Sequence, residues 1–363
     1  MLVGTRPEVI KQAPVYIACR DALAPASVSL IGTGQHRELL DKALADFDLT
    51  LDRDLGIMRE GQTPISAAAA ILHGLEPLLA EDPPDWIVVQ GDTTSAAMAA
   101  WAAFHAGVGV AHNEAGLRTY DLSQPFPEEA NRKLISAVAT EHFAPTEHAR
   151  RALLAEACPA ERIHVTGNPG IDALRMTLAK PQPPRVTELL AEGGREIVLM
   201  TAHRRENRGE RMEEWFATLA RFLAAHPDLR LVYPMHPNGA GYEAAVHHLS
   251  DLSRVQLVEP LDYTETCHLL RHCRFTITDS GGIQEEGATL GVPVVVCRRV
   301  TERPEAIDAG AAYLASTEAA PLQLALDWAY RRSATRDHET FDPIFGDGHA
   351  GPRIASIIGE RLG

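Results

Sequence analysis

Two adjacent glycines and two carboxylates stand together in TDSGGIQEE, residues 278–286. The apolar run before them is typical of a β-strand, and the residues after them are typical of a helix. A helix N-terminus carries unpaired N–H groups and partial positive charge, so it attracts anions. Gly281 and Gly282 would let a phosphate approach the backbone, and Glu286 could accept hydrogen bonds from sugar hydroxyls. A plain strand-to-helix turn with capping acids is the alternative that this stretch leaves open.

Charged and polar residues follow several other apolar runs in the same way. In open α/β sheets, ligands bind beyond the carboxyl ends of the strands. The candidates in the first half of the chain are Arg6, Lys11, Asp92, Glu114, Glu128 and Arg132. The candidates in the second half are His203, Ser280, Gly281, Gly282, Glu286 and Arg303.

Several of these residues also have an ordinary structural interpretation. Asp92 could cap the helix that follows it, PFPEEANR could be a simple helix start, and His203 could lie in a solvated loop. Glu114 is different, because a charge at the end of a buried strand needs a partner or a role. Since all of these candidates follow the carboxyl ends of predicted strands, we favour a common ligand-binding site over separate structural roles. Cations and N–H groups suit phosphates and carboxylates suit proton transfer, which together predict a sugar-nucleotide substrate.

Length and composition limit the class of protein. The 363 residues exceed what one core usually organises, so two domains are expected. A net charge of −15 argues against a general nucleic-acid binder. The five cysteines are scattered, which argues against a disulfide framework. No apolar run approaches the ~20 residues of a membrane span, and no signal-peptide pattern is present. We therefore expect a cytoplasmic protein with no nucleic-acid or membrane partner.

Short runs rich in Val, Ile and Leu alternate with longer periodic segments along the whole chain. This alternation predicts an α/β fold with parallel sheets, in two doubly wound, Rossmann-like domains. The proline-rich segment 178–194 breaks the rhythm and is interpreted as the connection between them. Only three residues precede Gly4, fewer than the usual 5–6 of a strand, which suggests that the chain begins a few residues late.

The motifs and their order resemble those of the non-hydrolysing UDP-N-acetylglucosamine 2-epimerases. The resemblance covers essentially the whole chain and rests on GTRPEVIK, GTGQHRELL, GDTT, HNEAGLRT, PFPEEANR, TGNPGIDAL, TAHRREN, TDSGGIQEE, GVPVVV and TERPEAIDAG. It implies GT-B architecture, in which two Rossmann-like domains enclose an active-site cleft. We place the N-terminal domain at residues 1–170, completed by a C-terminal helix at 349–363, and the UDP-binding domain at 171–348.

The resemblance also implies an activity. The family interconverts UDP-GlcNAc and UDP-ManNAc for cell-surface polysaccharides, by anti elimination of UDP to 2-acetamidoglucal and re-addition. This route needs no metal and no cofactor, and family members are usually homodimers. By resemblance, Asp92, Glu114 and Glu128 serve proton transfer and oxocarbenium stabilisation, and His203 assists the departing UDP. The resemblance assigns the nucleotide to Arg6, Lys11, Arg132, Ser280, Gly281, Gly282, Glu286 and Arg303.

The chain departs from the family pattern at several places, and residues 237–239, Pro-Asn-Gly where Leu-Asn-Pro is usual, are one of them. Family members read HVEAGLR, whereas Asn113 precedes Glu114 here. Asn113 could alter the hydrogen bonding of Glu114 or the accepted sugar, or it could point away. Relatives can also bind a second UDP-GlcNAc as an activator, near the positions of Gln35, His36 and Arg37. Gly61 stands where some relatives carry Arg, so we expect activation to be weaker or to use other contacts.

Other functions remain as alternatives. A hydrolysing 2-epimerase would release ManNAc and UDP after the same elimination, although GTRPE and HRREN argue against it. A GT-B glycosyltransferase needs fewer acids than this chain has, and a sugar-nucleotide sensor would tolerate their loss. The segment CHLLRHC, residues 267–273, has two histidines at metal-ligand spacing, but Leu269 stands where a zinc protease has its Glu. We therefore predict no metal site there.

Overall fold

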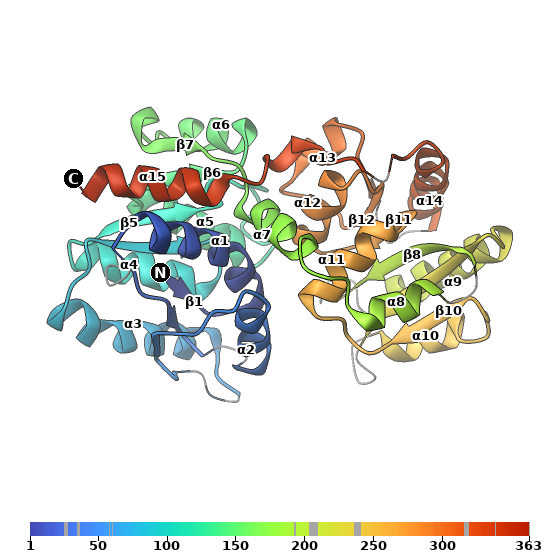
Figure 1. Ribbon diagram of the computed structural model, residues 1–363, viewed down its shortest axis with the longest axis horizontal. Helices are drawn as coiled ribbons and strands as arrows, with labels where there is room; N and C mark the ends of the chain where they lie inside the picture. Colours follow the sequence, from blue (N-terminus) through green and yellow to red (C-terminus); the bar gives the residue numbers. More distant parts are fainter. Residues whose placement is uncertain are drawn as a thin grey trace. The chain divides into compact units, whose positions relative to one another are not determined.

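The computed structural model describes residues 1–24, 28–34, 37–57, 59, 61–191, 194–202, 210–235, 241–315, 319–337 and 339–362. Contacts divide the chain into two compact units, shown in Figure 1. Unit 1 comprises Met1–Met176 and Phe345–Gly363, and unit 2 comprises Thr177–Ile344. The boundaries predicted above, at 170/171 and 348/349, lie a few residues from these divisions. Within the described ranges, no helix is both long enough and apolar enough to cross a membrane.

Unit 1 alternates strands and helices along the chain. Its elements are β1 (Leu2–Val3), α1 (Arg6–Ala22), β2 (Ile31–Gly32), α2 (Arg37–Asp46), β3 (Arg53–Asp54), α3 (Pro64–Glu81), β4 (Trp86–Gln90), α4 (Thr94–His105), β5 (Gly109–Asn113), α5 (Glu128–Val138), β6 (Glu141–Ala144), α6 (Glu147–Ala155), the 3-10 turn η2 (Ala160–Arg162), β7 (Ile163–Val165), α7 (Pro169–Leu178) and α15 (Ala350–Leu362).

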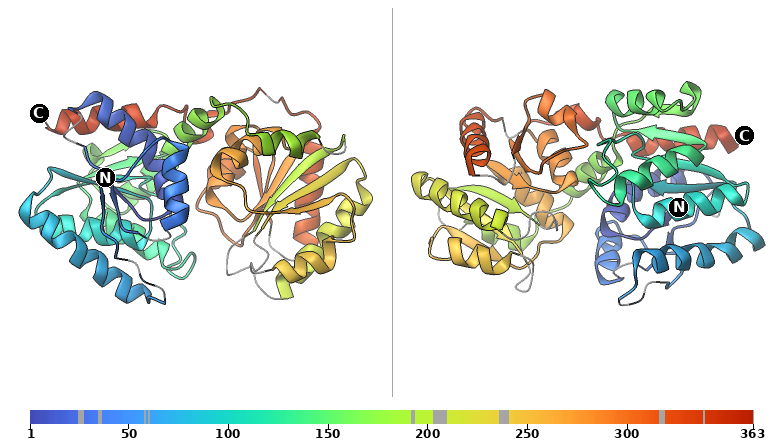
Figure 2. Two further views of the ribbon diagram at one scale, coloured as in Figure 1. Left: turned by 60° about the horizontal axis from the view of Figure 1, so that its bottom comes forward. Right: turned by 180° about the vertical axis from the view of Figure 1, so that it is seen from behind.

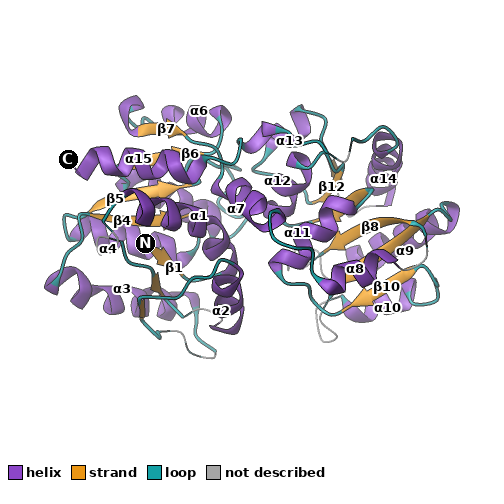
Figure 3. Cartoon of the chain, viewed as in Figure 1, coloured by secondary structure: helices purple, strands orange, loops and turns teal. Residues whose placement is uncertain are grey.

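The strands of unit 1 form two parallel sheets, drawn in orange in Figure 3, with orders β1-β2-β3 and β4-β5-β6-β7. β1 and β4 are neighbours in space, although no ladder joins them. One face packs on α3, α4 and α5, and the other packs on α1 and α15. The C-terminal helix α15 lies beside α1 in Figure 1. Asp172 accepts hydrogen bonds from Ala350 N and Gly351 N, and so caps the start of α15.

Unit 2 has the same alternation. Its elements are α8 (Pro184–Ala191), β8 (Glu196–Thr201), α9 (Glu210–Ala225), β9 (Leu229–Pro234), α10 (Tyr242–Leu249), β10 (Val255–Val258), α11 (Tyr263–His272), β11 (Phe275–Thr278), α12 (Gly281–Thr289), β12 (Val294–Cys297), α13 (Pro304–Asp308), β13 (Ala312–Ala315), α14 (Ala319–Ser333) and the 3-10 turn η4 (Pro343–Phe345).

The six strands of unit 2 form one parallel sheet in the order β10-β9-β8-β11-β12-β13. Numbered within the unit, this is 3-2-1-4-5-6, the strand order of a Rossmann fold. Figure 2 shows helices on both faces of this sheet, as expected where parallel strands are apolar on both sides. The order reverses between β8 and β11, and a ligand is expected beyond the carboxyl ends of the strands at that point.

The proline-rich segment 178–194 is not only a connection. It contains α8, which begins at Pro184, and Val186 and Leu189 are buried on one side of this helix. Proline is favoured at the first helical position because its missing N–H needs no partner there. Pro184 therefore marks the start of a helix. The segment predicted as a connection begins at the division between the two units, next to residue 177, and also contains this helix of unit 2.

Candidate active site

The carboxyl ends of β4 and β5 bring the first two predicted acids to one edge of a sheet in unit 1. The strands are parallel, and Gln90 pairs in register with Asn113 at their last residues. Asp92 follows β4 and Glu114 follows β5 directly. Two carboxylates that lie 22 residues apart in the sequence are thus placed at neighbouring strand ends.

Glu114 is held by donors on both of its carboxylate oxygens. Lys11 Nζ lies 2.6 Å from Oε1, and Gln90 Nε2 donates to Oε2 at 2.5 Å. All three side chains are almost completely buried. The backbone of Glu114 has φ 61°, a left-handed conformation that costs about 1–3 kcal/mol for a residue other than glycine. This local strain turns the chain out of β5 and aims the side chain toward α1.

A second pair of buried amides lies behind this contact. Asn113 Nδ2 donates to Gln12 Oε1 at 3.0 Å, and Gln12 Nε2 donates to Val88 O at 3.2 Å. Neither side chain is exposed. Asn113 therefore does not touch the carboxylate of Glu114 through these bonds. It joins the end of β5 to α1, the helix that carries Lys11.

Asp92 is bound by residues of α5, and its cationic partner is Arg132 rather than Lys11. Arg132 Nε donates to Asp92 Oδ2 at 2.9 Å, and Nη2 lies 2.7 Å from the same oxygen. Arg132 Nη1 also donates to the buried Glu129 at 2.8 Å. Asn131 Nδ2 donates to the backbone oxygen of Asp92 at 2.8 Å. Glu128, the third predicted acid, is the first residue of α5 and is half-buried.

Glu8 joins the two loops that carry the motifs GTRPE and GDTT. Its carboxylate accepts bonds from Gly4 N at 2.9 Å and Thr5 N at 2.7 Å, and from Thr93 Oγ1 at 2.6 Å. Thr93 in turn caps α4. Burial raises the pKa of Glu8, and these hydrogen bonds oppose the increase. Arg6, the first residue of α1, follows this junction directly.

A buried histidine on β5, His112, supports the turn that Gly91 and Asp92 form after β4. The ring Nε2 of His112 donates to Gly91 O at 2.8 Å. Burial lowers the pKa of His112 to about 3, and the nearby His142 and arginines lower it further. His112 is therefore neutral near pH 7 and acts as a hydrogen-bond donor within the fold.

In unit 2, the predicted phosphate loop has the expected local structure. β11 ends at Thr278, Ser280 is the N-cap, and α12 begins at Gly281. Thr278 Oγ1 accepts a bond from Ser280 N at 2.9 Å and lies 2.6 Å from Thr201 Oγ1 at the end of β8. The loop therefore lies at the reversal of strand order, where such folds bind ligands.

Arg303 lies directly over the first residue of α12. A Cβ added to Gly281 would lie 2.6 Å from Arg303 Cζ. The guanidinium pairs with Glu285, 2.6 Å from Nε to Oε1, and with Glu302 through Nη1. Arg303 is only 5% exposed. Its charge is thus matched within the protein, whereas the sequence had suggested a cation available to the substrate.

Glu286 lies on α12 and is almost fully buried. The neighbouring Tyr263 is also buried, and burial, together with Cys267 and Glu286, raises its pKa well above the ordinary value. Tyr263 therefore stays protonated, as a phenol beside the carboxylate.

Four predicted residues cannot be placed in full. Gln35, His36 and His203 lie outside the described residues. Arg37 begins α2, but its side chain is not described. The predicted roles of these four stay predictions.

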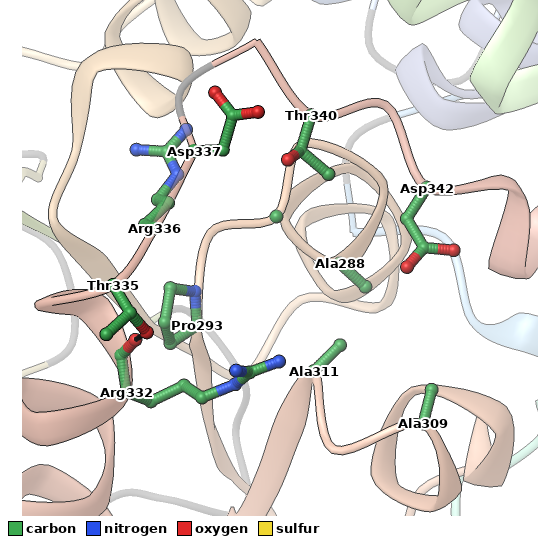
Figure 4. A pocket seen from close by; sticks show the side chains of 11 residues that line it. Ala288, Pro293, Ala309, Ala311, Arg332, Thr335, Arg336, Asp337, Thr340 and Asp342 are labelled. Atoms are coloured by element: carbon green, nitrogen blue, oxygen red, sulfur yellow. Dashed lines mark hydrogen bonds between the residues drawn. The ribbon is translucent and has the colours of Figure 1, made fainter.

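A cavity of about 200 Å³ in unit 2 lies away from these groups (Figure 4). It lies at the amino ends of β12 and β13, which Pro293 and Ala311 precede. Arg336 lines it, but this side chain donates to the backbone oxygens of Arg271 and Leu290 at 2.8 and 3.2 Å. Among the residues that the structure describes, no group of three or more His, Cys, Asp or Glu side chains could hold a metal ion.

Sequence analysis did not single out several polar residues that contact the predicted acids. Gln90, Gln12, Glu8 and Asn131 hold Glu114, Asn113 and the GDTT loop in place. One signal was available, since Gln90 ends the otherwise apolar strand WIVVQ. A polar side chain at such a position requires a hydrogen-bond partner.

The chain is similar in sequence and in fold to proteins of one known family. The UDP-N-acetylglucosamine 2-epimerase family matches residues 21–359. The chain is 42% identical to the UDP-N-acetylglucosamine 2-epimerase of Yersinia pestis, over 98% of this chain and 96% of that protein. It is 41% identical to the Bacillus subtilis enzyme of the same name, over 98% and 93%.

Solved structures of similar proteins have the same fold. A Neisseria meningitidis UDP-GlcNAc 2-epimerase bound to UDP-GlcNAc has 35% identity and a TM-score of 0.88, covering 99% of this chain and 98% of that one. An Anabaena protein in complex with UDP and glucose, at 14% identity and a TM-score of 0.59 over 99% and 98%, shares the fold. The predicted α/β fold class of GT-B type is confirmed. The chain belongs to the UDP-N-acetylglucosamine 2-epimerase family, a family of isomerases, as its motifs predicted.

Proposed function

We propose that this chain catalyses the reversible C2 epimerisation of UDP-N-acetylglucosamine to UDP-N-acetylmannosamine without net hydrolysis. Family membership supports the reaction. The observation that carries it in this chain is the placement of Asp92 and Glu114 at neighbouring strand ends, each held by its own cation. Binding of a sugar nucleotide alone would not need two buried or half-buried carboxylates fixed in this way.

The chemistry is elimination followed by addition. In the first step the C2–H bond breaks and its electron pair forms the C1=C2 double bond of 2-acetamidoglucal. The C2 proton passes to a carboxylate of the protein. The C1–O bond breaks at the same time, and UDP leaves with the electron pair of that C1–O bond. UDP then adds back to C1, while a proton is delivered to the opposite face of C2.

The three acids take different parts in this proposal. Glu114, with donors on both oxygens, presents a fixed negative charge that stabilises the oxocarbenium character at C1. Asp92 is 27% exposed on its side chain, and both Arg132 contacts fall on Oδ2. Asp92 and Glu128 therefore suit transfer of the C2 proton, one for each face of the sugar.

The nucleotide end is assigned to unit 2. The N-terminus of α12, from Ser280 to Gly282, would receive the diphosphate through backbone N–H groups. Glu286 would accept bonds from the ribose, and Arg303, which is paired with Glu285 and Glu302, packs over Gly281 at this helix start. Arg6, Lys11, Arg132 and His203 complete the proposed set, with His203 assisting the departure of UDP.

Proton NMR of the purified protein with UDP-GlcNAc in deuterated water tests the proposal. We expect deuterium at C2 of UDP-GlcNAc and of a new UDP-ManNAc signal. Accumulation of free ManNAc and UDP would instead identify a hydrolysing enzyme. Absence of exchange by a protein that binds UDP would refute the proposed reaction.

The variant Glu114→Gln separates catalysis from binding. It replaces the carboxylate by an uncharged amide of the same shape, so it should abolish C2 exchange and leave UDP affinity within about twofold, a difference of roughly 0.4 kcal/mol. A non-catalytic sensor would show no exchange before or after the substitution. A variant with full activity would remove Glu114 from the mechanism.

A further inference from the structure

The contact between Gln90 and Glu114 suggests a role that the family motifs do not include. We infer that Gln90 is a positioning residue: its side-chain amide fixes the orientation of the Glu114 carboxylate for the reaction. This inference rests on the proposed function, because it takes Glu114 to act in catalysis. Gln90 Nε2 donates to Glu114 Oε2 at 2.5 Å, and Lys11 Nζ holds the other oxygen at 2.6 Å.

The two donors come from different elements, which is why they can fix an orientation. Lys11 projects from α1, and Gln90 is the last residue of β4. A single contact would leave the carboxylate free to rotate about its terminal bond, whereas two donors on its two oxygens define its plane. The left-handed backbone of Glu114 aims the side chain, and the two donors hold its end.

Gln90 occupies a position where an apolar residue would otherwise be expected. Side chains alternate along β4, and Val88, two residues earlier on the same face, belongs to the core between the sheet and α1. Gln90 itself is 2% exposed. A buried amide at this place needs an explanation that a buried valine does not.

The amide is only half satisfied. Among the described residues, Gln90 Oε1 is buried and has no hydrogen-bond partner. A buried acceptor without a partner is destabilising, and an apolar side chain of similar size would avoid that cost. The bond that the amide does make goes to Glu114, so stability alone does not account for Gln90.

The variants Gln90→Met and Gln90→Glu test the inference, with Gln12→Met as the matched control. Methionine has nearly the shape of glutamine but donates no hydrogen bond. Gln12 is equally buried and also bonds in this layer, but to Asn113 and Val88 rather than to Glu114. The kcat and KM of epimerisation are measured at steady state, together with UDP affinity by calorimetry and the thermal unfolding temperature.

We expect Gln90→Met to lower kcat by about tenfold to a hundredfold, the value of one hydrogen bond to a charged group. KM and UDP affinity should stay within about twofold, because the lost bond does not contact the nucleotide. Gln90→Glu removes the same donor and places a second carboxylate beside the first, so it should lower kcat at least as much as Gln90→Met.

The control defines what refutes the inference. Gln12→Met should lower the unfolding temperature and leave kcat within about twofold of the wild-type value, because Gln12 does not bond to Glu114. If Gln90→Met changes only the unfolding temperature, as the control does, Gln90 is structural and the inference is wrong. If Gln90→Met does not fold, Gln90→Glu, which keeps the shape of the side chain, carries the same test. Failure of the wild-type protein to exchange the C2 proton would instead refute the proposed function.

Discussion

Gly281 and Gly282 are neighbours at the start of α12, but their surroundings differ. A Cβ on Gly281 would lie 2.6, 2.7 and 2.8 Å from Arg303 Cζ, Nη1 and Nη2. The nearest atom to a Cβ on Gly282 would be Ser280 Oγ, at 4.0 Å. Neither glycine has a positive φ, so alanine meets no backbone strain at either place. The pair of variants Gly281→Ala and Gly282→Ala therefore isolates a steric effect.

The magnitudes follow from these distances. In Gly281→Ala the guanidinium of Arg303 has to move, and it is held by ion pairs with Glu285 and Glu302. Overpacking of this kind costs about 1–3 kcal/mol. In Gly282→Ala the added methyl group meets open space, and replacing glycine in a helix gains about 0.5–1 kcal/mol. Both glycines lie in the first turn of α12, so the gain from replacing glycine applies to both variants and cancels. The two variants should therefore differ by about 1–3 kcal/mol in the free energy of unfolding.

Urea unfolding followed by tryptophan fluorescence measures this difference, and titration calorimetry with UDP tests the role of the loop. If the diphosphate lies against the backbone here, both variants should bind UDP at least tenfold more weakly, while only Gly281→Ala loses stability. Equal stabilities would refute the steric reasoning about Arg303. Wild-type UDP affinity in Gly282→Ala would refute the assignment of the phosphate to this glycine.

Two further predictions concern unit 1. Lys11→Met and Glu114→Gln should each lower the free energy of unfolding by about 3–5 kcal/mol, because each removes the oppositely charged partner of a buried charge. In a double-mutant cycle measured by urea unfolding, the double variant should cost clearly less than the sum of the single variants, and additive costs would contradict the pairing. His112, whose pKa is lowered to about 3, stays neutral in the folded state, while the same residue in the unfolded chain takes up a proton below about pH 6.5. The free energy of unfolding should therefore fall as pH decreases from about 6.5 toward 3, by at most about 1.4 kcal/mol per pH unit from this residue. His112→Gln should make this decrease with pH less steep in unfolding curves at pH 7, 6 and 5. His73→Gln, at an exposed position on α3, should leave it unchanged.

The sequence indicated the fold class and the strand ends at which the candidate site residues lie. Both follow from local patterns. Alternating apolar strands and periodic helices predict parallel sheets, and the carboxyl ends of such strands are where ligands bind. TDSGGIQEE therefore located the start of α12 correctly, and Asp92 and Glu114 were placed at strand ends before any contact was known.

The tertiary structure decided how the side chains pair. Lys11 and Glu114 are 103 residues apart, and Glu8 and Thr93 are 85 apart. The sequence left open whether Asn113 acts on Glu114. In the fold its side-chain amide donates instead to Gln12, a residue of α1 that lies 101 positions away in the sequence. A hydrogen bond depends on position to within a few tenths of an ångström, whereas sequence periodicity determines only which face of an element a residue occupies. For that reason the candidate acids could be predicted from the sequence, whereas the amides that contact them, such as Gln90, became evident only from the fold.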